Sequence, residues 1–255
     1  MMINFSEALA VVILAAGKGK RMNNPDMAKV MALLNGKPLI SYVLDEVAYL
    51  EPARTIVVVG YQKDSIIEFI SSNYQNIEFA EQREQLGTGH AVAQCRVLLE
   101  NFKGKILILA GDVPLIKSDT LKDFIQHNYN ENAAVSVLSV IAPDPTGYGR
   151  IIRSDSGDFV KITEHKDADE RQKEIKEINS GIFLVDSRHL FSSLSQLHNK
   201  NAQGEYYLTD IVEIMSKDKL KICAWASDDF LQFQGINTAD DLALAENSIL
   251  KKQSR

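Results

Sequence analysis

Val11-Val12-Ile13-Leu14-Ala15-Ala16-Gly17-Lys18-Gly19-Lys20-Arg21 is the stretch that decides the fold. Its apolar start is typical of a strand that is covered on both faces in a mostly parallel sheet. The small and basic residues that follow predict a loop at the carboxyl end of that strand, the edge where ligands bind in open α/β sheets. The loop lacks the third glycine of a dinucleotide fingerprint and the Gly-Lys-Ser/Thr of a Walker A loop. Because its glycines coincide with three cations, we expect it to bind phosphate rather than to be a plain turn.

Further apolar runs alternate with segments of helical period along the chain. Amphipathic helices are predicted from Pro38, from Ser118, which can cap its helix, and around Ile211. The alternation predicts an α/β fold in which helices flank a mostly parallel mixed sheet. The predicted strands are residues 10–15, 55–60, 105–110, 134–140, 182–185 and 220–225.

One part of the chain breaks this alternation. Residues 149–164 have no helical period and carry Ser154-Asp155-Ser156-Gly157-Asp158 in the middle, which predicts a β-hairpin. Residues 164–177 are dense in charge, which indicates a solvated face or an exposed helix. We find no Pro- or Ser-rich linker and no internal repeat. We therefore predict a single domain over residues 1–255, with residues 141–180 inserted as a smaller lobe.

Composition and charge restrict the classes of partner. The 255 residues carry 28 Lys and Arg against 34 Asp and Glu, a formal net charge of −6, and 45% of them are hydrophobic. This balance excludes a disordered chain and argues against a nucleic-acid partner, which needs a basic surface. Five cations lie between Lys18 and Lys37 against the single acid Asp26. Such a local cluster favours a compact polyanion such as a nucleoside triphosphate.

The sequence predicts a cytoplasmic protein without membrane association. The two cysteines, Cys95 and Cys223, make neither a disulfide framework nor a zinc site, so a reducing compartment is expected. The longest N-terminal apolar run, residues 8–16, is far shorter than the roughly 20 residues that cross a bilayer. A secretory signal requires Lys or Arg before its apolar run, and none precedes this one.

Two polar residues are candidate metal ligands. Asp112 follows the strand predicted at residues 105–110, and Mg²⁺ takes one or two carboxylates together with phosphate oxygens. Asp112 can equally be a turn residue that accepts from nearby backbone N–H groups. Asn237 is ambiguous in the same way, because it precedes a helix predicted over residues 238–250 and can cap it. The pattern leaves both alternatives open.

Seven motifs in order resemble a known enzyme family over nearly the whole chain. The Gly-rich loop resembles the signature of sugar-1-phosphate nucleotidyltransferases, which several nucleotide specificities share. With six further motifs, the chain resembles the uridylyltransferase domains of bacterial N-acetylglucosamine-1-phosphate uridylyltransferases. These motifs are Glu84-Gln85-Leu86-Gly87-Thr88-Gly89-His90-Ala91, Gly111-Asp112-Val113-Pro114-Leu115-Ile116, Pro145-Thr146-Gly147-Tyr148-Gly149-Arg150-Ile151, Glu164-His165-Lys166-Asp167-Ala168, Glu177-Ile178-Asn179-Ser180-Gly181-Ile182 and Asn201-Ala202-Gln203-Gly204-Glu205-Tyr206-Tyr207-Leu208-Thr209-Asp210.

The resemblance implies a Rossmann-like nucleotide-diphospho-sugar transferase fold with a small β-rich sugar-binding lobe. It also implies that UTP and N-acetylglucosamine 1-phosphate give UDP-N-acetylglucosamine and pyrophosphate, with Mg²⁺ as cofactor. Arg21, Lys29 and Asp112 would then be catalytic, and Asp112 and Asn237 would hold the metal. Gln82 can present both an acceptor and donors to the uracil edge. By the same resemblance, the nucleotide would be bound by Leu14, Ala15, Ala16, Gly17, Gln82, Gly87, Thr88 and Gly111, and the sugar by Gly149, Glu164 and Asn179.

The implied reaction needs no protein nucleophile. The second pKa of a phosphate monoester is about 6, so a sugar phosphate is mostly dianionic at pH 7 and can attack without a general base. Catalysis then consists of in-line positioning and neutralisation of charge on the transferring group. We accordingly expect His90 and His165 to be structural or supporting residues.

The chain also departs from the family it resembles. Ala110 stands where family members have Tyr, Ala28 replaces a Pro, and Ser180 replaces a Thr. No hexapeptide repeats of a left-handed β-helix follow the last predicted helix. We therefore expect acetyltransferase activity to be absent, and a monomer or weak dimer rather than the trimer that such repeats build.

Two alternatives to the implied function remain. Ala110 motivates a nucleotidyltransferase for another sugar 1-phosphate. A non-catalytic sugar-nucleotide binding protein is the second alternative, against which the presence of Arg21, Lys29, Asp112 and Asn237 argues.

Overall fold

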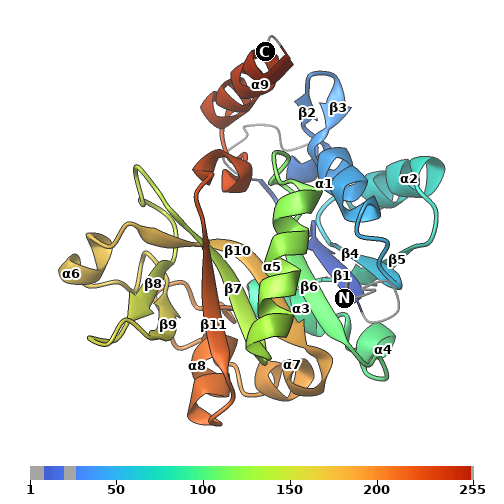
Figure 1. Ribbon diagram of the computed structural model, residues 1–255. Coiled ribbons are helices and arrows are strands. Elements are labelled where there is room, and N and C mark those ends of the chain that lie inside the picture. Colours follow the sequence, from blue (N-terminus) through green and yellow to red (C-terminus); the bar gives the residue numbers. More distant parts are fainter. Residues whose placement is uncertain (1–8, 20–26, 254–255) are drawn as a thin grey trace.

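The computed structural model describes residues 9–19 and 27–253. Its strands are β1 Leu9–Leu14, β2 Leu33–Leu34, β3 Lys37–Pro38, β4 Arg54–Val59, β5 Ile77–Glu81, β6 Lys105–Ala110, β7 Val135–Ile141, β8 Arg150–Arg153, β9 Phe159–Thr163, β10 Glu177–Asp186 and β11 Ile222–Ser227. Its helices are η2 Lys29–Met31, α1 Leu39–Ala48, α2 Lys63–Asn73, α3 Thr88–Ala93, α4 Arg96–Leu99, α5 Ser118–Glu131, α6 Glu170–Lys173, α7 Ser187–Leu194, α8 Asp210–Lys217, η3 Phe230–Phe233 and α9 Ala239–Gln253. A central sheet has helices on both faces, β8, β9 and α6 project from one side, and α9 lies apart from the sheet, beyond the end near β2 and β3 (Figure 1).

The sheet is mixed, as predicted. Its main path runs β11-β7-β10-β6-β1-β4-β5, and β8 and β9 extend it from β10 to make nine strands. β1 pairs in parallel with both β4 and β6, whereas β10 pairs antiparallel with β6, β7 and β8. Leu14 is in register with Ala110, so the carboxyl ends of β1 and β6 meet at one edge. The Gly-rich loop and the segment around Asp112 therefore leave the sheet side by side.

The core lies on both faces of the sheet. Val11 and Ile13 pack in one buried cluster and Ala10 and Val12 in another, and all four side chains are fully buried. α1, α2 and α5 cover the first face, and α3, α4, α7 and α8 cover the second. This three-layer arrangement explains why β1 is a continuous apolar run rather than an alternating one.

Three details of the predicted elements were wrong. β5 was not predicted, and β10 begins at Glu177 rather than at residue 182. Ser118 does not cap α5: Lys117 is the N-cap residue and makes no side-chain cap. Instead, the Glu46 carboxylate of α1 accepts from the Ser118 N–H at 2.7 Å, so the negative charge that the helix start favours comes from a neighbouring helix.

The lobe follows the predicted hairpin. β8 and β9 pair antiparallel, with Arg150 opposite Thr163. α6 is a short exposed helix that begins with a capping box, in which the side chains of Asp169 and Gln172 each accept from the backbone N–H of the other residue. β8 joins the main sheet through the bridge between Arg150 and Ile178 of β10. Within residues 9–19 and 27–253, every helix is too short or too polar to span a bilayer.

Candidate functional site

Two cavities meet at the sheet edge where β1 and β6 end. The smaller, about 290 Å³, is lined by Leu14, Ala15, Ala16, Gly17, Lys29, Val30, Gln82, Gln85, Gly87, Thr88, Ala91, Ala110, Asp112 and Glu205. The larger, about 590 Å³, is lined by Gly17, Lys18, Gly19, Lys29, Gln85, Gln203, Glu205 and Asn237. The loop Leu14–Gly19 and Lys29 border both cavities. We call them the nucleoside cavity and the phosphate cavity, after the groups that the sequence analysis leads us to expect there.

Lys29, Asp112 and Asn237 converge between these cavities. The Lys29 ammonium donates to the Asp112 carboxylate, and its Nζ also donates to Asn237 Oδ1 at 2.6 Å. The Ile236 N–H donates to the Asp112 carbonyl at 2.9 Å, which ties the segment before α9 to the end of β6. A Cβ on Gly19 would lie 2.6 Å from the Lys29 Cβ, so only glycine lets the loop pack this closely on Lys29.

Asn237 does not cap α9. The Asp241 carboxylate accepts from the N–H groups of Asn237 and Thr238 at 2.8 and 2.9 Å, and Thr238 Oγ1 accepts from the Asp241 N–H at 3.1 Å. Thr238 and Asp241 therefore satisfy the start of the helix between them. The Asn237 side chain is left to turn toward Lys29, which favours the ligand alternative for this residue.

The donor chemistry between Asp112 and Asn237 fits a hard divalent cation. A carboxylate and an amide oxygen already accept from one cationic group, Lys29, so both oxygens face a common point. A Cβ added to Gly235 would lie within 3.9 Å of both Asp112 oxygens and 3.5 Å from Asn237 Nδ2, which shows how closely these groups gather. Among the described residues, no group of three or more His, Cys, Asp or Glu side chains could hold a metal by itself. Phosphate oxygens would have to complete the coordination.

The nucleoside cavity contains one buried amide with a fixed orientation. Gln82 is 4% exposed, and its Nε2 donates to the Gly87 carbonyl at 3.0 Å. Gly87 precedes α3 with φ 111°, and a Cβ there would lie 2.6 Å from the Tyr206 carbonyl, so this position needs glycine. The sequence had suggested that Gln82 could offer both donors and an acceptor to a base. In the structure, its amide nitrogen is already engaged by the Gly87 carbonyl.

The three predicted sugar residues lie together at the root of the lobe. Asn179 donates its N–H to the Gly149 carbonyl at 2.9 Å, and a Cβ on Gly149 would lie 3.5 Å from Glu164 Oε2. The register of β10 shifts between Asn179 and Ile182, and Asn179 Oδ1 accepts from the Gly181 N–H at 2.9 Å within this irregular segment. The pKa of the Glu164 carboxyl is raised above its usual value because the group is buried. A hydrogen bond from the Thr209 hydroxyl at 3.1 Å opposes this shift but is outweighed by burial.

Residues 206–209 join the predicted sugar residues to the nucleoside cavity, and the sequence had assigned no role to them. The Leu208 N–H donates to Thr88 Oγ1 at 3.1 Å, while Thr209 holds Glu164. The Gly89 N–H donates to the Tyr206 carbonyl at 2.8 Å. Their only signal in the sequence was the motif at residues 201–210, which gives no indication of these partners.

Of the remaining two predicted site residues, the structure describes Gly111 but not Arg21. Gly111 supports the strand edge, since its N–H donates to the Leu14 carbonyl at 2.9 Å and a Cβ there would lie 3.1 Å from that oxygen. Arg21 lies outside the described residues.

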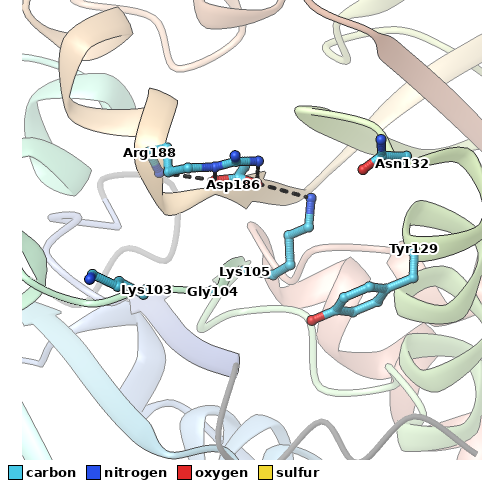
Figure 2. A pocket seen from close by; sticks show the side chains of 7 residues that line it. All are labelled: Lys103, Gly104, Lys105, Tyr129, Asn132, Asp186 and Arg188. Carbon is cyan, nitrogen blue, oxygen red and sulfur yellow. Dashed lines mark hydrogen bonds and ion pairs between the residues drawn. The ribbon is translucent and has the colours of Figure 1, made fainter.

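A third cavity, of about 610 Å³, lies at the opposite edge of the sheet. Lys105 at the start of β6 extends toward Asp186 at the end of β10, and Arg188 lies over the same carboxylate (Figure 2). Lys105 Nζ also donates to the Ala133 carbonyl at 2.8 Å, and both Asp186 oxygens accept from Arg188. Its two buried charged side chains are thus already paired, and we assign this group a role in stability.

The family comparison covers almost the whole chain. A family model described as Nucleotidyl transferase matches residues 10–252. HddC from Yersinia pseudotuberculosis, solved in complex with GMP-PN, superposes with a TM-score of 0.70 at 20% identity, covering 94% of this chain and 99% of that one. At that identity the similarity shows the fold alone, and it agrees with the predicted nucleotidyltransferase fold.

Sequence relatives agree with this family model. The bifunctional protein GlmU of Exiguobacterium sibiricum is 44% identical over 241 residues, 94% of this chain and 53% of that protein. The bifunctional protein GlmU of Lactococcus lactis subsp. lactis is 42% identical over 241 residues, 94% of this chain and 52% of that protein. The chain spans about half the length of the curated relatives it matches. On these matches and this fold, the chain belongs to the nucleotidyl transferase family.

Proposed function

We propose that the chain transfers the uridylyl group of UTP to N-acetylglucosamine 1-phosphate, releasing pyrophosphate. The observation that carries this proposal is the convergence of Lys29, Asp112 and Asn237 between the nucleoside and phosphate cavities. A cation, a carboxylate and an amide oxygen at one point suit a triphosphate that lies across both cavities. The relatives named GlmU support the choice of reaction.

The phosphate cavity is suited to bind and offset negative charge. Lys18 and Lys29 line it, and the small side chains of Gly17 and Gly19 leave the backbone of the loop accessible. Lys29 would stabilise the charge that develops on the leaving pyrophosphate, and we propose the same task for Arg21. Asp112 and Asn237 would hold Mg²⁺. When bound, this ion would neutralise charge on the phosphate oxygens.

The nucleoside cavity is suited to read a base. Leu14, Ala15 and Ala16 line it from the end of β1 and the loop that follows, together with Gln82, Gly87 and Thr88. The small residues leave room for a planar ring against the backbone. Gln82 supplies the only buried side-chain amide of this lining among the described residues.

On the sugar side, we propose that residues 141–180 act as a sugar-binding lobe within one catalytic domain. Gly149, Glu164 and Asn179 gather where this lobe meets the main sheet. The Glu164 carboxylate would accept from sugar hydroxyl groups, and the absence of a side chain at Gly149 would leave space beside it. Thr209 would keep Glu164 oriented through their hydrogen bond.

The sugar phosphate would attack the α-phosphorus directly. A dianionic phosphate needs no protein base, and the residues above act by position and charge. We propose a cytoplasmic setting, where nucleoside triphosphates are available. Ala110 contributes only a methyl group to the nucleoside cavity, so the sugar specificity needs its own test.

The test is pyrophosphate release with Mg²⁺, UTP and a panel of sugar 1-phosphates. The proposal predicts the highest kcat/KM for N-acetylglucosamine 1-phosphate. Preference for a sugar without the N-acetyl group would favour the related transferase instead. No release with any sugar would overturn the enzymatic proposal and leave a sugar-nucleotide binding protein.

A further inference from the structure

The orientation of the Gln82 amide is set by two partners. Its Nε2 donates to the Gly87 carbonyl at 3.0 Å and lies 3.1 Å from His90 Nδ1. A carbonyl oxygen only accepts, so the NH₂ end of the amide must face Gly87. An NH₂ group has two hydrogens, and the second lies toward His90 Nδ1, which accepts only when it carries the lone pair of the ring. In that tautomer both donors of Gln82 are used inside the protein.

The remaining atom of this amide is its acceptor. Gln82 lines the nucleoside cavity, and no donor from the described residues reaches its Oε1. Uracil carries a hydrogen on N3, whereas cytosine carries a lone pair at the same position. An acceptor at this point pairs with uracil and repels cytosine. The reverse amide orientation would present NH₂ and favour cytosine.

His90 contributes to this orientation only if its Nδ1 carries the lone pair. Its other nitrogen, Nε2, lies 3.1 Å from Gln94 Nε2, and Gln94 Nε2 also donates to the His90 carbonyl at 2.9 Å. A neutral imidazole accepts at one nitrogen only, so the ring can satisfy one of the two amides. Gln82 is buried and has no alternative partner in water, whereas Gln94 is half-exposed. Burial therefore assigns the lone pair to Nδ1 and the proton to Nε2.

We propose that His90 is a positioning residue that sets the nucleobase specificity of the chain. As an Nδ1 acceptor, it holds the Gln82 NH₂ away from the nucleoside cavity and leaves Oε1 to read the N3–H of uracil. The inference rests on the proposed function, because it assumes that this cavity receives the base of the nucleotide. It gives a task to a histidine that the implied reaction leaves without one.

Variants at His90 separate this role from ring packing. His90→Phe keeps a ring and removes both nitrogens, whereas His90→Asn retains an acceptor near the position of Nδ1. We would measure kcat/KM for UTP and CTP with N-acetylglucosamine 1-phosphate and Mg²⁺. His90→Phe should lower the UTP-to-CTP ratio at least tenfold, mainly through a higher KM for UTP. His90→Asn should keep the ratio within threefold of the wild-type value.

Gln94→Met is the matched control, because it removes the contact at Nε2 and leaves Nδ1 to Gln82. Its UTP-to-CTP ratio and its KM for the sugar phosphate should stay within twofold of wild type. An unchanged ratio in folded His90→Phe would overturn the proposal, as would an equal loss in His90→Asn. If the wild-type protein turns over no nucleotide, it is the proposed function that fails.

A spectroscopic measurement tests the proposal without any variant. Long-range ¹H–¹⁵N spectra of the wild-type protein at neutral pH report which imidazole nitrogen carries the proton. The proposal predicts the Nε2–H form of His90, with Nδ1 unprotonated. The Nδ1–H form would contradict it, because that nitrogen could not accept from Gln82.

Discussion

Lys29 Nζ donates a hydrogen bond to Asn237 Oδ1 at 2.6 Å, although 208 residues separate the two in the sequence. The same ammonium contacts Asp112, so one cation holds together the two residues that we propose as metal ligands. Under the proposed function, Lys29 would exchange these partners for phosphate oxygens when a metal and a triphosphate bind. The three side chains would then act as one unit.

Replacing Lys29 by Met should reduce turnover sharply. Loss of one preorganised charge-stabilising donor typically costs about 2.7–4 kcal/mol, or about 10²–10³ in kcat. Steady-state kinetics at saturating UTP would measure this. Lys217→Met is the control, since Lys217 forms an exposed ion pair with Glu213 away from both cavities. A Lys29→Met variant with the wild-type kcat would contradict the assigned role.

Asp112→Asn should weaken the dependence on Mg²⁺ rather than only the rate. The substitution keeps the shape of the side chain and removes the carboxylate charge that a hard cation prefers. We expect a rise of at least tenfold in the Mg²⁺ concentration that gives half-maximal rate, measured at fixed UTP. Asp119→Asn on the exposed start of α5 serves as the control. An unchanged Mg²⁺ titration would mean that the metal is held elsewhere.

Arg150 should control sugar binding through the backbone of the lobe. It is 1% exposed, and its guanidinium donates to the carbonyls of Tyr148 and Lys173 and contacts His165 Nδ1. These contacts hold Tyr148 and His165, which neighbour Gly149 and Glu164 in the chain, and the backbone at Lys173. Arg150→Met should therefore raise KM for the sugar phosphate at least tenfold and leave KM for UTP nearly unchanged.

The stability of Arg150→Met provides a second readout. Within residues 9–19 and 27–253, the Arg150 guanidinium is held by carbonyl oxygens rather than by an ion pair, and Met leaves the carbonyls of Tyr148 and Lys173 without this donor. The melting temperature of Arg150→Met should therefore fall below that of the wild type. Arg153→Met on the same strand, where the guanidinium pairs with Glu177 at the surface, is the control. A wild-type KM for the sugar phosphate in Arg150→Met would contradict the role of Arg150 in holding the sugar-binding lobe.

Asp186 should make the fold sensitive to acid. Burial raises the pKa of its carboxyl, but hydrogen bonds from Arg188 and the charge of Lys105 outweigh burial and hold the pKa at about 2, below the usual 3.8. A depressed pKa stabilises the fold above about pH 4 and loses that contribution as the pH falls toward 2. The difference corresponds to about 2 kcal/mol.

The measurement for Asp186 is chemical denaturation between pH 6 and pH 2. The wild type should lose about 2 kcal/mol more unfolding free energy than Asp186→Asn over that interval. Asp119→Asn, at an exposed position, should follow the wild type. Parallel pH profiles for wild type and Asp186→Asn would contradict the assignment.

The sequence predicted the central strands well because their signal is local. β6 was predicted with its observed bounds, since both of its faces are buried and its apolar run is continuous. β5 was missed because Ile77–Glu81 is an edge strand with two glutamates. The start of β10 was missed because residues 177–181 are mostly polar and the strand register shifts between Asn179 and Ile182.

The sequence named candidate site residues but not their contacts. The resemblance implied roles for Lys29, Asp112 and Asn237, yet no local pattern indicates that one ammonium joins the other two side chains. The hydrogen bond from Thr209 to Glu164 could not be predicted either, because Glu164 lies 45 residues earlier in the chain. Such pairings follow from the strand order and the position of the lobe.

The most direct test uses a sugar phosphate labelled with oxygen-18 on its phosphate group, incubated with the protein, UTP and Mg²⁺. Phosphorus NMR and mass spectrometry then locate the label in the products. The proposed transfer predicts that all label appears in the UDP-sugar, with one labelled oxygen bridging its two phosphorus atoms, and that the released pyrophosphate carries none. Label in pyrophosphate or in inorganic phosphate, or no UDP-sugar at all, would contradict transfer of the uridylyl group to the sugar phosphate.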